Sequence, residues 1–364
     1  MLTRVNKLLD RLQEWNQESM FITSKANVYY ISNHYTDPHE RLIGIFIDKL
    51  GEPLLILPAM EKDTAIASGW QGDILSYADH ENPWELFYHY LNKSKRIPNT
   101  IGIEHDHFTI ERFEQIKAFF PETTTNDVKE HLANLRVIKD EKEYHLLKQA
   151  ANLADLGVEI GIKAIEEGKT ELEILATIEY ELKKQGIREM SFATMVLTGN
   201  KTAIPHGTPG LDTIKPGDLV LFDLGVVFEG YCSDITRTVA YKQINDQQKD
   251  IYQTVLSAQK AAISHAKLQQ PIGSLDQVAR KHITDKGYGE YFTHRLGHGI
   301  GIDVHEFPSM TSTNSLPLLP GMSFTIEPGI YIPEIGGVRI EDQVLMTDGG
   351  IELLTKYPKE LQIL

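Results

Sequence analysis

The sequence places a charged residue, Asp223, inside one of its strand-like apolar runs, Leu219–Leu224. A charge in such a run costs free energy unless it is paired or bound to a metal ion. Asp234 follows on the return strand of the same predicted hairpin. If residues 229 and 230 form a two-residue turn, Asp223 faces Thr236, and Asp234 lies diagonally beside Asp223, within about 8 Å. A three-residue loop would instead place the two carboxylates on opposite faces of the hairpin. Since two carboxylates that close repel each other, the hairpin indicates a proton or a cation between them.

Two more carboxylates and one histidine lie in comparable surroundings. Glu327 ends an alternating strand-like run, and Glu341 alternates with apolar neighbours. His298 is flanked by glycines, which allow the backbone to approach a bound group closely. Two divalent cations would cancel the charge of four carboxylates, which favours a dinuclear site. Oxygen ligands with one imidazole and no thiolate favour Mn²⁺ or a similar ion over structural zinc.

The charge and the composition exclude several other classes of protein. The 364 residues include 36 Lys and Arg against 51 Asp and Glu, a net charge of −15. Such a charge repels nucleic acid and anionic membranes, and the apolar runs are far shorter than the ~20 residues of a membrane span. The single cysteine, Cys232, can form neither an internal disulfide nor a thiolate cage. We therefore expect a cytoplasmic protein that binds neither nucleic acid nor a membrane.

The first part of the chain, residues 1–128, alternates strand-like and helix-like patterns, which predicts an α/β domain. A cluster of charged residues and histidines, 104–107, follows one of the strands, where a solvated turn is the expected structure. The predicted strands are 42–47, 53–57, 74–77 and 101–103, and the predicted helices are 60–68, 83–91 and 109–120.

Residues 129–364 are predicted to form a second domain that contains two similar halves. Each half has two helices followed by paired strands, so we expect an internal pseudo-twofold with strands inside and helices outside, and an α+β chain overall. The strand-like segments are 219–241 in the first half and 322–327 and 337–346 in the second. Three helix starts fit capping boxes, formed by Asp140 with Glu143, Thr170 with Glu173 and Ser274 with Gln277.

Five residues in order along the chain, Asp223, Asp234, His298, Glu327 and Glu341, resemble the five-ligand signature of the pita-bread metallopeptidases. This group includes prolidases, aminopeptidases P and methionine aminopeptidases. The resemblance covers about residues 132–364, and residues 21–120 resemble the creatinase-type domain of prolidases and aminopeptidases P, which methionine aminopeptidases lack. The matching contexts are Phe222-Asp223-Leu224-Gly225, Ser233-Asp234-Ile235-Thr236-Arg237, Gly297-His298-Gly299-Ile300-Gly301, Thr325-Ile326-Glu327-Pro328-Gly329 and Arg339-Ile340-Glu341-Asp342.

The resemblance implies a role for each of these residues. Asp223 would bind one of two divalent ions, His298 and Glu327 the other, and Asp234 and Glu341 would bridge both. The ions would be Mn²⁺, with Co²⁺ or Zn²⁺ as alternatives, and a hydroxide shared by them would attack the peptide carbonyl.

Three further residues receive roles from the same resemblance. Glu327 would also accept a proton, which makes it catalytic as well as a metal ligand. His206 and His305 would lie beside the substrate and stabilise the oxyanion, so they are expected to be both catalytic and substrate-binding. Arg339, two positions before Glu341, is expected to orient a carboxylate of the site and to bind substrate.

The resemblance favours a prolidase that cleaves Xaa-Pro dipeptides and forms a homodimer, with aminopeptidase P as the alternative. Prolidases of this type often carry an arginine shortly after the second histidine, which binds the free carboxylate of the dipeptide. Here Pro308-Ser309-Met310 follows, and no arginine occurs between Arg295 and Arg339. The choice between dipeptides and longer proline-containing peptides therefore stays open at this point.

Other interpretations fit the sequence less well. His305-Glu306 begins a zincin-like motif, but Ser309 stands where the second histidine would be. The glycines around His298 lack the βαβ context of a nucleotide loop. Creatinase and non-enzymatic binding proteins of the same fold lack the metal ligands, whereas all five residues are present here.

Overall fold

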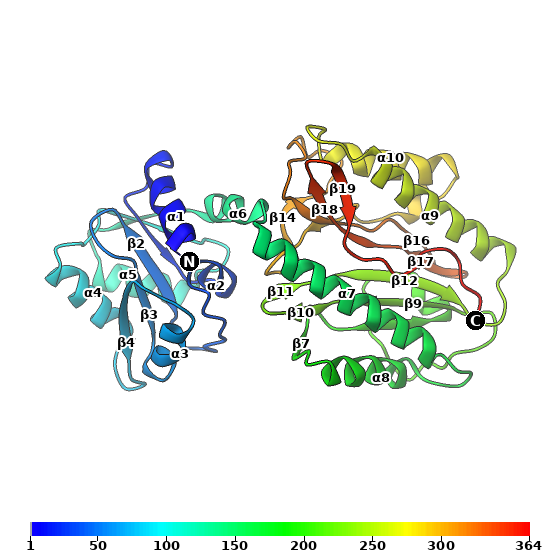
Figure 1. Ribbon diagram of the computed structural model, residues 1–364, viewed down its shortest axis with the longest axis horizontal. Coiled ribbons are helices and arrows are strands. Elements are labelled where there is room, and N and C mark those ends of the chain that lie inside the picture. Colours follow the sequence, from blue (N-terminus) through cyan, green and yellow to red (C-terminus); the bar gives the residue numbers. More distant parts are fainter. Residues whose placement is uncertain (1) are drawn as a thin grey trace. The chain divides into compact units, whose positions relative to one another are not determined.

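The computed structural model describes residues 2–364, and the chain divides into two compact units, one ending at Leu135 and one comprising Arg136–Leu364 (Figure 1). The predicted domain boundary between residues 128 and 129 stays a prediction. No helix within the described residues is both long and apolar enough to cross a membrane.

The N-terminal unit is an α/β domain built on a six-stranded sheet of order β4-β3-β2-β1-β5-β6. Strand β2 runs antiparallel to both neighbours, and the other pairs are parallel. The predicted strands and helices of this unit are all present, although α1, α2, β1 and β6 were not predicted. The elements are α1 (Leu2–Glu14), β1 (Ser19–Ile22), α2 (Lys25–Ser32), β2 (Gly44–Asp48), β3 (Leu54–Pro58), α3 (Lys62–Ala67), β4 (Asp73–Tyr77), α4 (Pro83–Lys93), β5 (Thr100–Ile103), α5 (Ile110–Phe119) and β6 (Thr124–Asp127). Helix α6 (Lys129–Val137), which was not predicted either, begins in this unit and ends in the next.

The expectation of a solvated turn after β5 is wrong for Glu104, whose side chain is buried. Its Oε2 accepts hydrogen bonds from the backbone N–H groups of Thr23 at 2.7 Å and Ser24 at 2.9 Å. Its Oε1 accepts one from the Asn27 side chain at 2.7 Å. The carboxylate therefore satisfies donors at the start of α2, a structural role that the local sequence around Glu104 does not reveal.

The C-terminal unit has the two expected halves, each with a pair of helices followed by antiparallel strands. The order of the main sheet is β12-β9-β8 in the first half and β14-β13-β15-β18-β19 in the second. The elements are α7 (Glu141–Ala164), α8 (Glu171–Lys184), β7 (Glu189–Met190), β8 (Met195–Thr198), β9 (Leu219–Leu224), β10 (Val226–Phe228), β11 (Tyr231–Cys232), β12 (Ile235–Ala240), α9 (Asp246–His265), α10 (Gly273–Asp285), β13 (His298–Gly299), β14 (Glu306–Ser309), β15 (Ser323–Ile326), β16 (Gly329–Ile332), β17 (Gly336–Arg339), β18 (Asp342–Thr347) and β19 (Gly350–Leu353).

The helices of this unit lie outside its strands, α7 and α8 on one side and α9 and α10 on the other (Figure 1). One apolar cluster joins α7 and α8 to β8, β9 and β12, and a second joins α9 and α10 to the strands of the other half. Burial of these apolar faces holds the strands, and with them the polar groups between the halves, in place. Each unit has the predicted fold: a creatinase-type α/β domain in the N-terminal unit and a pita-bread arrangement in the C-terminal unit.

Two of the three predicted capping boxes are confirmed, at the starts of α7 and α8. The third is wrong. Helix α10 begins at Gly273 without a side-chain cap, the Ser274 hydroxyl donates to Pro271 O at 2.7 Å, and the Gln277 amide donates to Ser312 O at 2.7 Å. A capping box that was not predicted, Asn245 with Gln248, begins α9 instead.

Candidate metal centre

The hairpin that carries Asp223 has the predicted turn and register. Glu229 and Gly230 adopt φ values of 47° and 80°, the left-handed conformations of a two-residue hairpin turn. Phe228 faces Tyr231, and further along the ladder Asp223 faces Thr236. The predicted two-residue turn and the pairing of Asp223 with Thr236 are therefore confirmed.

The hairpin is not one continuous ladder, because its pairing is interrupted at Gly225. A Cβ atom on Gly225 would lie 1.8 Å from the Ser233 carbonyl oxygen, so only glycine fits there. Asp234 lies in this interruption, between β11 and β12. The break leaves Asp234 at the edge of the ladder, and both its carboxylate and that of Asp223 line one cavity.

The second pair of carboxylates also lies where strands end. Glu327 directly follows β15, and its N–H donates to Leu296 O at 2.8 Å. The predicted strand 337–346 is broken, since Ile340 and Glu341 lie between β17 and β18. Strand ends free a side chain from the regular alternation, so ligand-type residues at such places can converge on one point.

All five predicted ligands line a single cavity of about 480 Å³. The nearest ligand-type atoms of Asp234, His298 and Glu341 lie within 4.8 Å of one another. His298 Nε2 is 3.6 Å from Asp234 Oδ2 and 3.3 Å from Glu327 Oε1. The other lining residues are Phe192, Ala193, Met195, Pro205, His206, His294, Arg295, Val304, His305 and Arg339.

Three carboxylates of this cavity, those of Asp234, Glu327 and Glu341, disfavour their charged forms. Burial raises the pKa of Asp234 and of Glu341 well above the ordinary range, and the neighbouring carboxylates reinforce both shifts. Burial likewise raises the pKa of Glu327 to about 7, although Arg339 opposes that shift. Such crowding is stable with all groups ionised only when positive charge lies among them.

The cavity fits divalent cations. Asp223 Oδ1, Asp234 Oδ1 and Glu341 Oε1 are buried, and none has a hydrogen-bond partner among the described residues. An unsatisfied buried carboxylate oxygen is costly unless an ion or water binds it. Free carboxylate oxygens beside an imidazole form a donor set suited to Mn²⁺ and related ions.

His298 has the protonation state that a metal ligand needs. Its Nδ1 lies 3.1 Å from the Gly299 carbonyl, which can only accept, so Nδ1 carries the hydrogen and Nε2 keeps its lone pair toward the cavity. Burial and the neighbouring His305 lower its pKa to about 3, so the ring is neutral at neutral pH. A carbonyl that fixes the tautomer in this way is typical of ligating histidines.

The Arg339 side chain forms an ion pair and hydrogen bonds within the wall of the cavity. Its guanidinium forms an ion pair with Asp223 and donates to Thr236 Oγ1 at 3.1 Å and to the Tyr331 hydroxyl at 2.9 Å. Thr236 Oγ1 in turn donates to Glu341 Oε2 at 2.7 Å. These contacts hold two of the carboxylates in place, while the expected contact of Arg339 with substrate stays a prediction.

The two histidines predicted to lie beside the substrate also line the cavity. The ring of His305 packs edge-on against that of His298, with 4.2 Å between the ring centres. Burial lowers the pKa of His305, and the nearby Arg295 and His206 add to the shift. His305 is therefore neutral at neutral pH and can donate an N–H to an anionic oxygen.

Sequence reasoning missed Arg295 as a residue of the site. Its side chain is half-buried in the cavity wall, and Nη1 donates to Ser309 Oγ at 3.1 Å. No ion pair involving it is found among the described residues. The Arg295 guanidinium therefore lies beside the segment that follows His305, which has no arginine of its own. The pairing of β13 with β14 brings the two together.

Glu306, next to His305, belongs to a different kind of acidic group. It forms an ion pair with Arg136 and another with Lys139 at 3.1 Å, and it accepts the Asp303 N–H at 3.0 Å. Burial alone would raise its pKa, but the charges of Arg136 and Lys139 lower it to about 2. The charge of Glu306 is therefore balanced by Arg136 and Lys139, and its contacts hold the loop that carries His305 in place.

Comparison with known protein families gives two matches. Residues 145–348 match the model of metallopeptidase family M24, and residues 4–138 match that of the creatinase/prolidase N-terminal domain. A relative from Bacillus subtilis (strain 168), YkvY, which bears the provisional name of a dipeptidase, is 52% identical over 363 residues and 100% of both chains.

Solved structures are similar over nearly the whole chain. The prolidase from Pyrococcus horikoshii OT3 is 36% identical with a TM-score of 0.91, covering 99% of this chain and 100% of that one. The Xaa-Pro dipeptidase from Bacillus anthracis is 33% identical with a TM-score of 0.92, covering 100% and 99%. The X-Pro aminopeptidase from Thermotoga maritima MSB8 is 30% identical with a TM-score of 0.88, covering 99% and 100%.

Proposed function

Since the chain belongs to metallopeptidase family M24, we propose that it is a prolidase that hydrolyses the Xaa-Pro bond of dipeptides with two divalent metal ions, Mn²⁺ foremost. One observation carries this proposal: four carboxylates and one neutral imidazole converge on a single cavity and leave buried oxygens unsatisfied. A cytoplasmic location and a homodimer are parts of the same proposal.

In this proposal the five residues hold the ions as a set. Asp223 and the pair His298 and Glu327 would each hold one ion, with Asp234 and Glu341 shared between them. When bound, the ions would lower the pKa of water toward neutrality and polarise the peptide carbonyl. The chain's own part is to fix the ligands, exclude bulk water and move protons.

Glu327 is the residue best placed to move a proton. Its carboxylate lies at the cavity surface, and Thr325 Oγ1 donates to its Oε1 at 3.2 Å. A carboxylate at this place can act as a general base and then as a general acid. It would accept the proton from the attacking water and pass it to the leaving proline nitrogen.

His305 and His206 would stabilise the oxyanion that develops on the peptide carbonyl. Both line the cavity, and the lowered pKa of His305 keeps this ring neutral and able to donate an N–H. A positioned donor of this kind contributes about 10²–10³-fold in rate.

Arg295 is our candidate for binding the free carboxylate of the dipeptide. Arg339 is already paired with Asp223, whereas Arg295 contacts only the Ser309 hydroxyl among the side chains described. A guanidinium in the cavity wall binds a carboxylate through two parallel hydrogen bonds. Short substrates would be preferred because that carboxylate is available one residue beyond the cleaved bond only in a dipeptide.

The alternative is an Xaa-Pro aminopeptidase, because the chain is also similar to the X-Pro aminopeptidase from Thermotoga maritima MSB8. The test compares hydrolysis of Xaa-Pro dipeptides, with Met, Leu or Ala first, against Xaa-Pro-Yaa tripeptides on the Mn²⁺-loaded protein. We expect fast cleavage of the dipeptides and little of longer peptides. Rapid release of the first residue from tripeptides with the dipeptides intact would assign the chain to the aminopeptidases.

A further inference from the structure

Glu341 is held in place by groups outside its own strands. Because it lies between β17 and β18, no regular ladder fixes its peptide groups. Its N–H donates to Thr236 O at 3.1 Å, and its carbonyl oxygen accepts from the Arg237 guanidinium. Its Oε2 accepts from Thr236 Oγ1 at 2.7 Å. Both the backbone and the carboxylate of Glu341 therefore depend on two neighbouring residues of β12.

The Arg237 guanidinium donates several further hydrogen bonds. The residue is almost closed to solvent, since only 2% of the surface of Arg237 is exposed. Nη1 also donates to Thr236 O at 3.0 Å, and Nη2 donates to Asp342 Oδ1 at 2.7 Å. Nε and Nη2 both donate to Tyr357 O, at 3.0 and 2.7 Å. A planar guanidinium can serve these acceptors together, whereas a lysine ammonium cannot.

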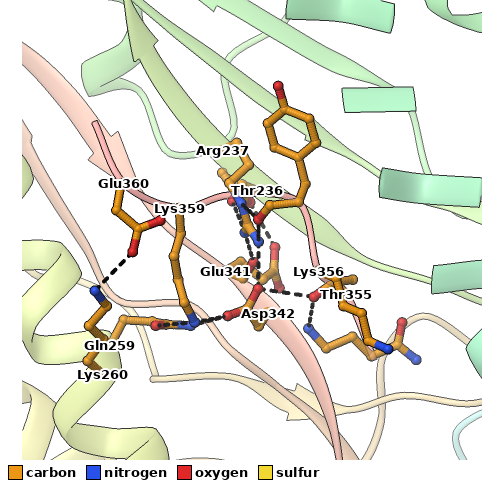
Figure 2. Close-up of polar contacts among 12 residues, drawn as sticks. Thr236, Arg237, Gln259, Lys260, Glu341, Asp342, Thr355, Lys356, Lys359 and Glu360 are labelled. Atoms are coloured by element: carbon orange, nitrogen blue, oxygen red, sulfur yellow. Dashed lines mark hydrogen bonds and ion pairs between the residues drawn. The ribbon is translucent and has the colours of Figure 1, made fainter. Parts of the chain in front are cut away.

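The C-terminal segment Thr355–Glu360 supplies much of this arrangement (Figure 2). Lys359 forms an ion pair with Asp342, and its Nζ donates to Gln259 Oε1 at 3.1 Å. Thr355 Oγ1 donates to the same Asp342 carboxylate at 3.1 Å. Asp342, next to Glu341 in the chain, is thus surrounded by groups from the segment and from α9.

The segment is anchored at a point remote from the cavity. The half-buried carboxylate of Asp155 on α7 accepts the Lys356 N–H at 2.8 Å and the Tyr357 N–H at 2.9 Å. These bonds fix the backbone of Tyr357, the residue whose carbonyl oxygen accepts from Arg237. A continuous set of hydrogen bonds therefore runs from Asp155 through Tyr357 and Arg237 to Glu341.

We propose that Arg237 and the C-terminal segment are positioning elements for Glu341, so that affinity for divalent ions depends on residues that contact neither ion nor substrate. The proposal rests on the proposed metal centre. Groups that orient metal ligands typically change metal affinity by about 10–100-fold when they are removed. Glu341 would keep its carboxylate but lose the fixed position from which it reaches the ions.

The test measures the dissociation constant for Mn²⁺ of the chelator-treated full chain by calorimetry, together with the unfolding temperature of the metal-free protein. We expect Arg237→Lys to raise the dissociation constant about 10–100-fold and Asp155→Ala to raise it by up to about 10-fold. Lys260→Ala is the matched control, because Lys260 lies on α9 beside this segment and, among the described residues, its one ion pair is with the exposed Glu360, at 3.1 Å. Its dissociation constant should equal that of the unmodified protein.

A lower unfolding temperature with an unchanged dissociation constant in both variants would overturn the proposal, since it would show an ordinary structural cluster. If Arg237→Lys does not fold, Asp155→Ala decides, because it leaves every buried charge of the cluster in place. If the unmodified protein binds no Mn²⁺, the proposed function fails as well. That result differs from the one in which the protein and its variants bind Mn²⁺ equally, which overturns the present proposal alone.

Discussion

The C-terminal unit buries two kinds of carboxylate with opposite electrostatics. At the cavity, Asp234, Glu327 and Glu341 lie close together, and their pKa values are raised. Away from it, Glu306 and Asp342 are equally buried, yet their pKa values are lowered because arginine and lysine side chains oppose the effect of burial. Burial alone therefore does not identify a metal ligand.

The difference lies in where the compensating charge comes from. The chain supplies its own cations to Glu306 and Asp342, which makes them parts of the scaffold. Among the described residues, the four cavity carboxylates have one ion pair with a guanidinium, that of Asp223 with Arg339, although Arg295 also lines the cavity. The missing positive charge is what the proposed divalent ions would provide, so the two groups should respond in opposite ways to the same kinds of change.

Removal of a shared carboxylate should have the largest effect. Glu341→Ala and Asp234→Ala should each lose bound metal and at least ~10³-fold in rate, more than the loss of a single oxyanion donor. Metal content and kcat/KM are measured on the same preparations. Retention of full metal content by either variant would remove that residue from the ligand set.

His305→Ala should separate rate from metal binding. We expect a loss of about 10²–10³-fold in kcat with metal content unchanged, because the ring would contact the substrate and not the ions. If the variant loses metal as completely as Glu341→Ala does, the assignment of His305 to the substrate side is wrong.

Neutralising one acid of each kind should change the stability of the metal-free protein in opposite directions. Glu306→Gln leaves the buried Lys139 without its counter-charge and Arg136 with Asp303 alone, and it should lower the free energy of unfolding by about 3–5 kcal/mol. Glu341→Gln removes like-charge repulsion and should raise it, on the order of 1 kcal/mol. Denaturant unfolding of the two metal-free variants measures each change in the free energy of unfolding. If both changes have the same sign, the distinction between the two kinds of buried carboxylate is wrong.

The pH dependence of the metal-free protein should show the same contrast. Since the folded pKa of Glu327 is raised to about 7, the folded state binds more protons than the unfolded state above the ordinary pKa. The free energy of unfolding should therefore fall as the pH rises from about 4.5 to 7; Glu327 contributes about 3 kcal/mol at most to this fall, and the raised pKa values of Asp234 and Glu341 act in the same direction. The contribution of Glu306, with a lowered pKa, stays constant over that range and is lost only as the pH falls toward about 2.

Thermal unfolding of metal-free and Mn²⁺-loaded protein across this pH range checks the prediction. The loaded protein should not lose stability between pH 4.5 and 7, because the ions favour the ionised carboxylates. A metal-free protein whose stability is flat or rises over the range would contradict the account of the cavity charges.

Much of the fold and most of the candidate site could be predicted from the sequence, because periodicity and turn chemistry are local. The register that places Asp223 opposite Thr236 follows from one two-residue turn. The break at Glu341 and the partners of Glu104 could not be predicted, since they depend on segments distant in the chain. Arg295 was missed for the same reason: only the pairing of β13 with β14 brings it to Ser309.

The number of divalent ions per chain tests the central claim most directly. The protein is stripped with a chelator, reloaded with Mn²⁺ and analysed for metal at each step while hydrolysis of an Xaa-Pro dipeptide is followed. The account predicts that activity reaches its plateau at about two ions per chain, as the charge of four carboxylates requires. Full activity of the metal-free protein, or a plateau at one ion with no second ion bound, would contradict it.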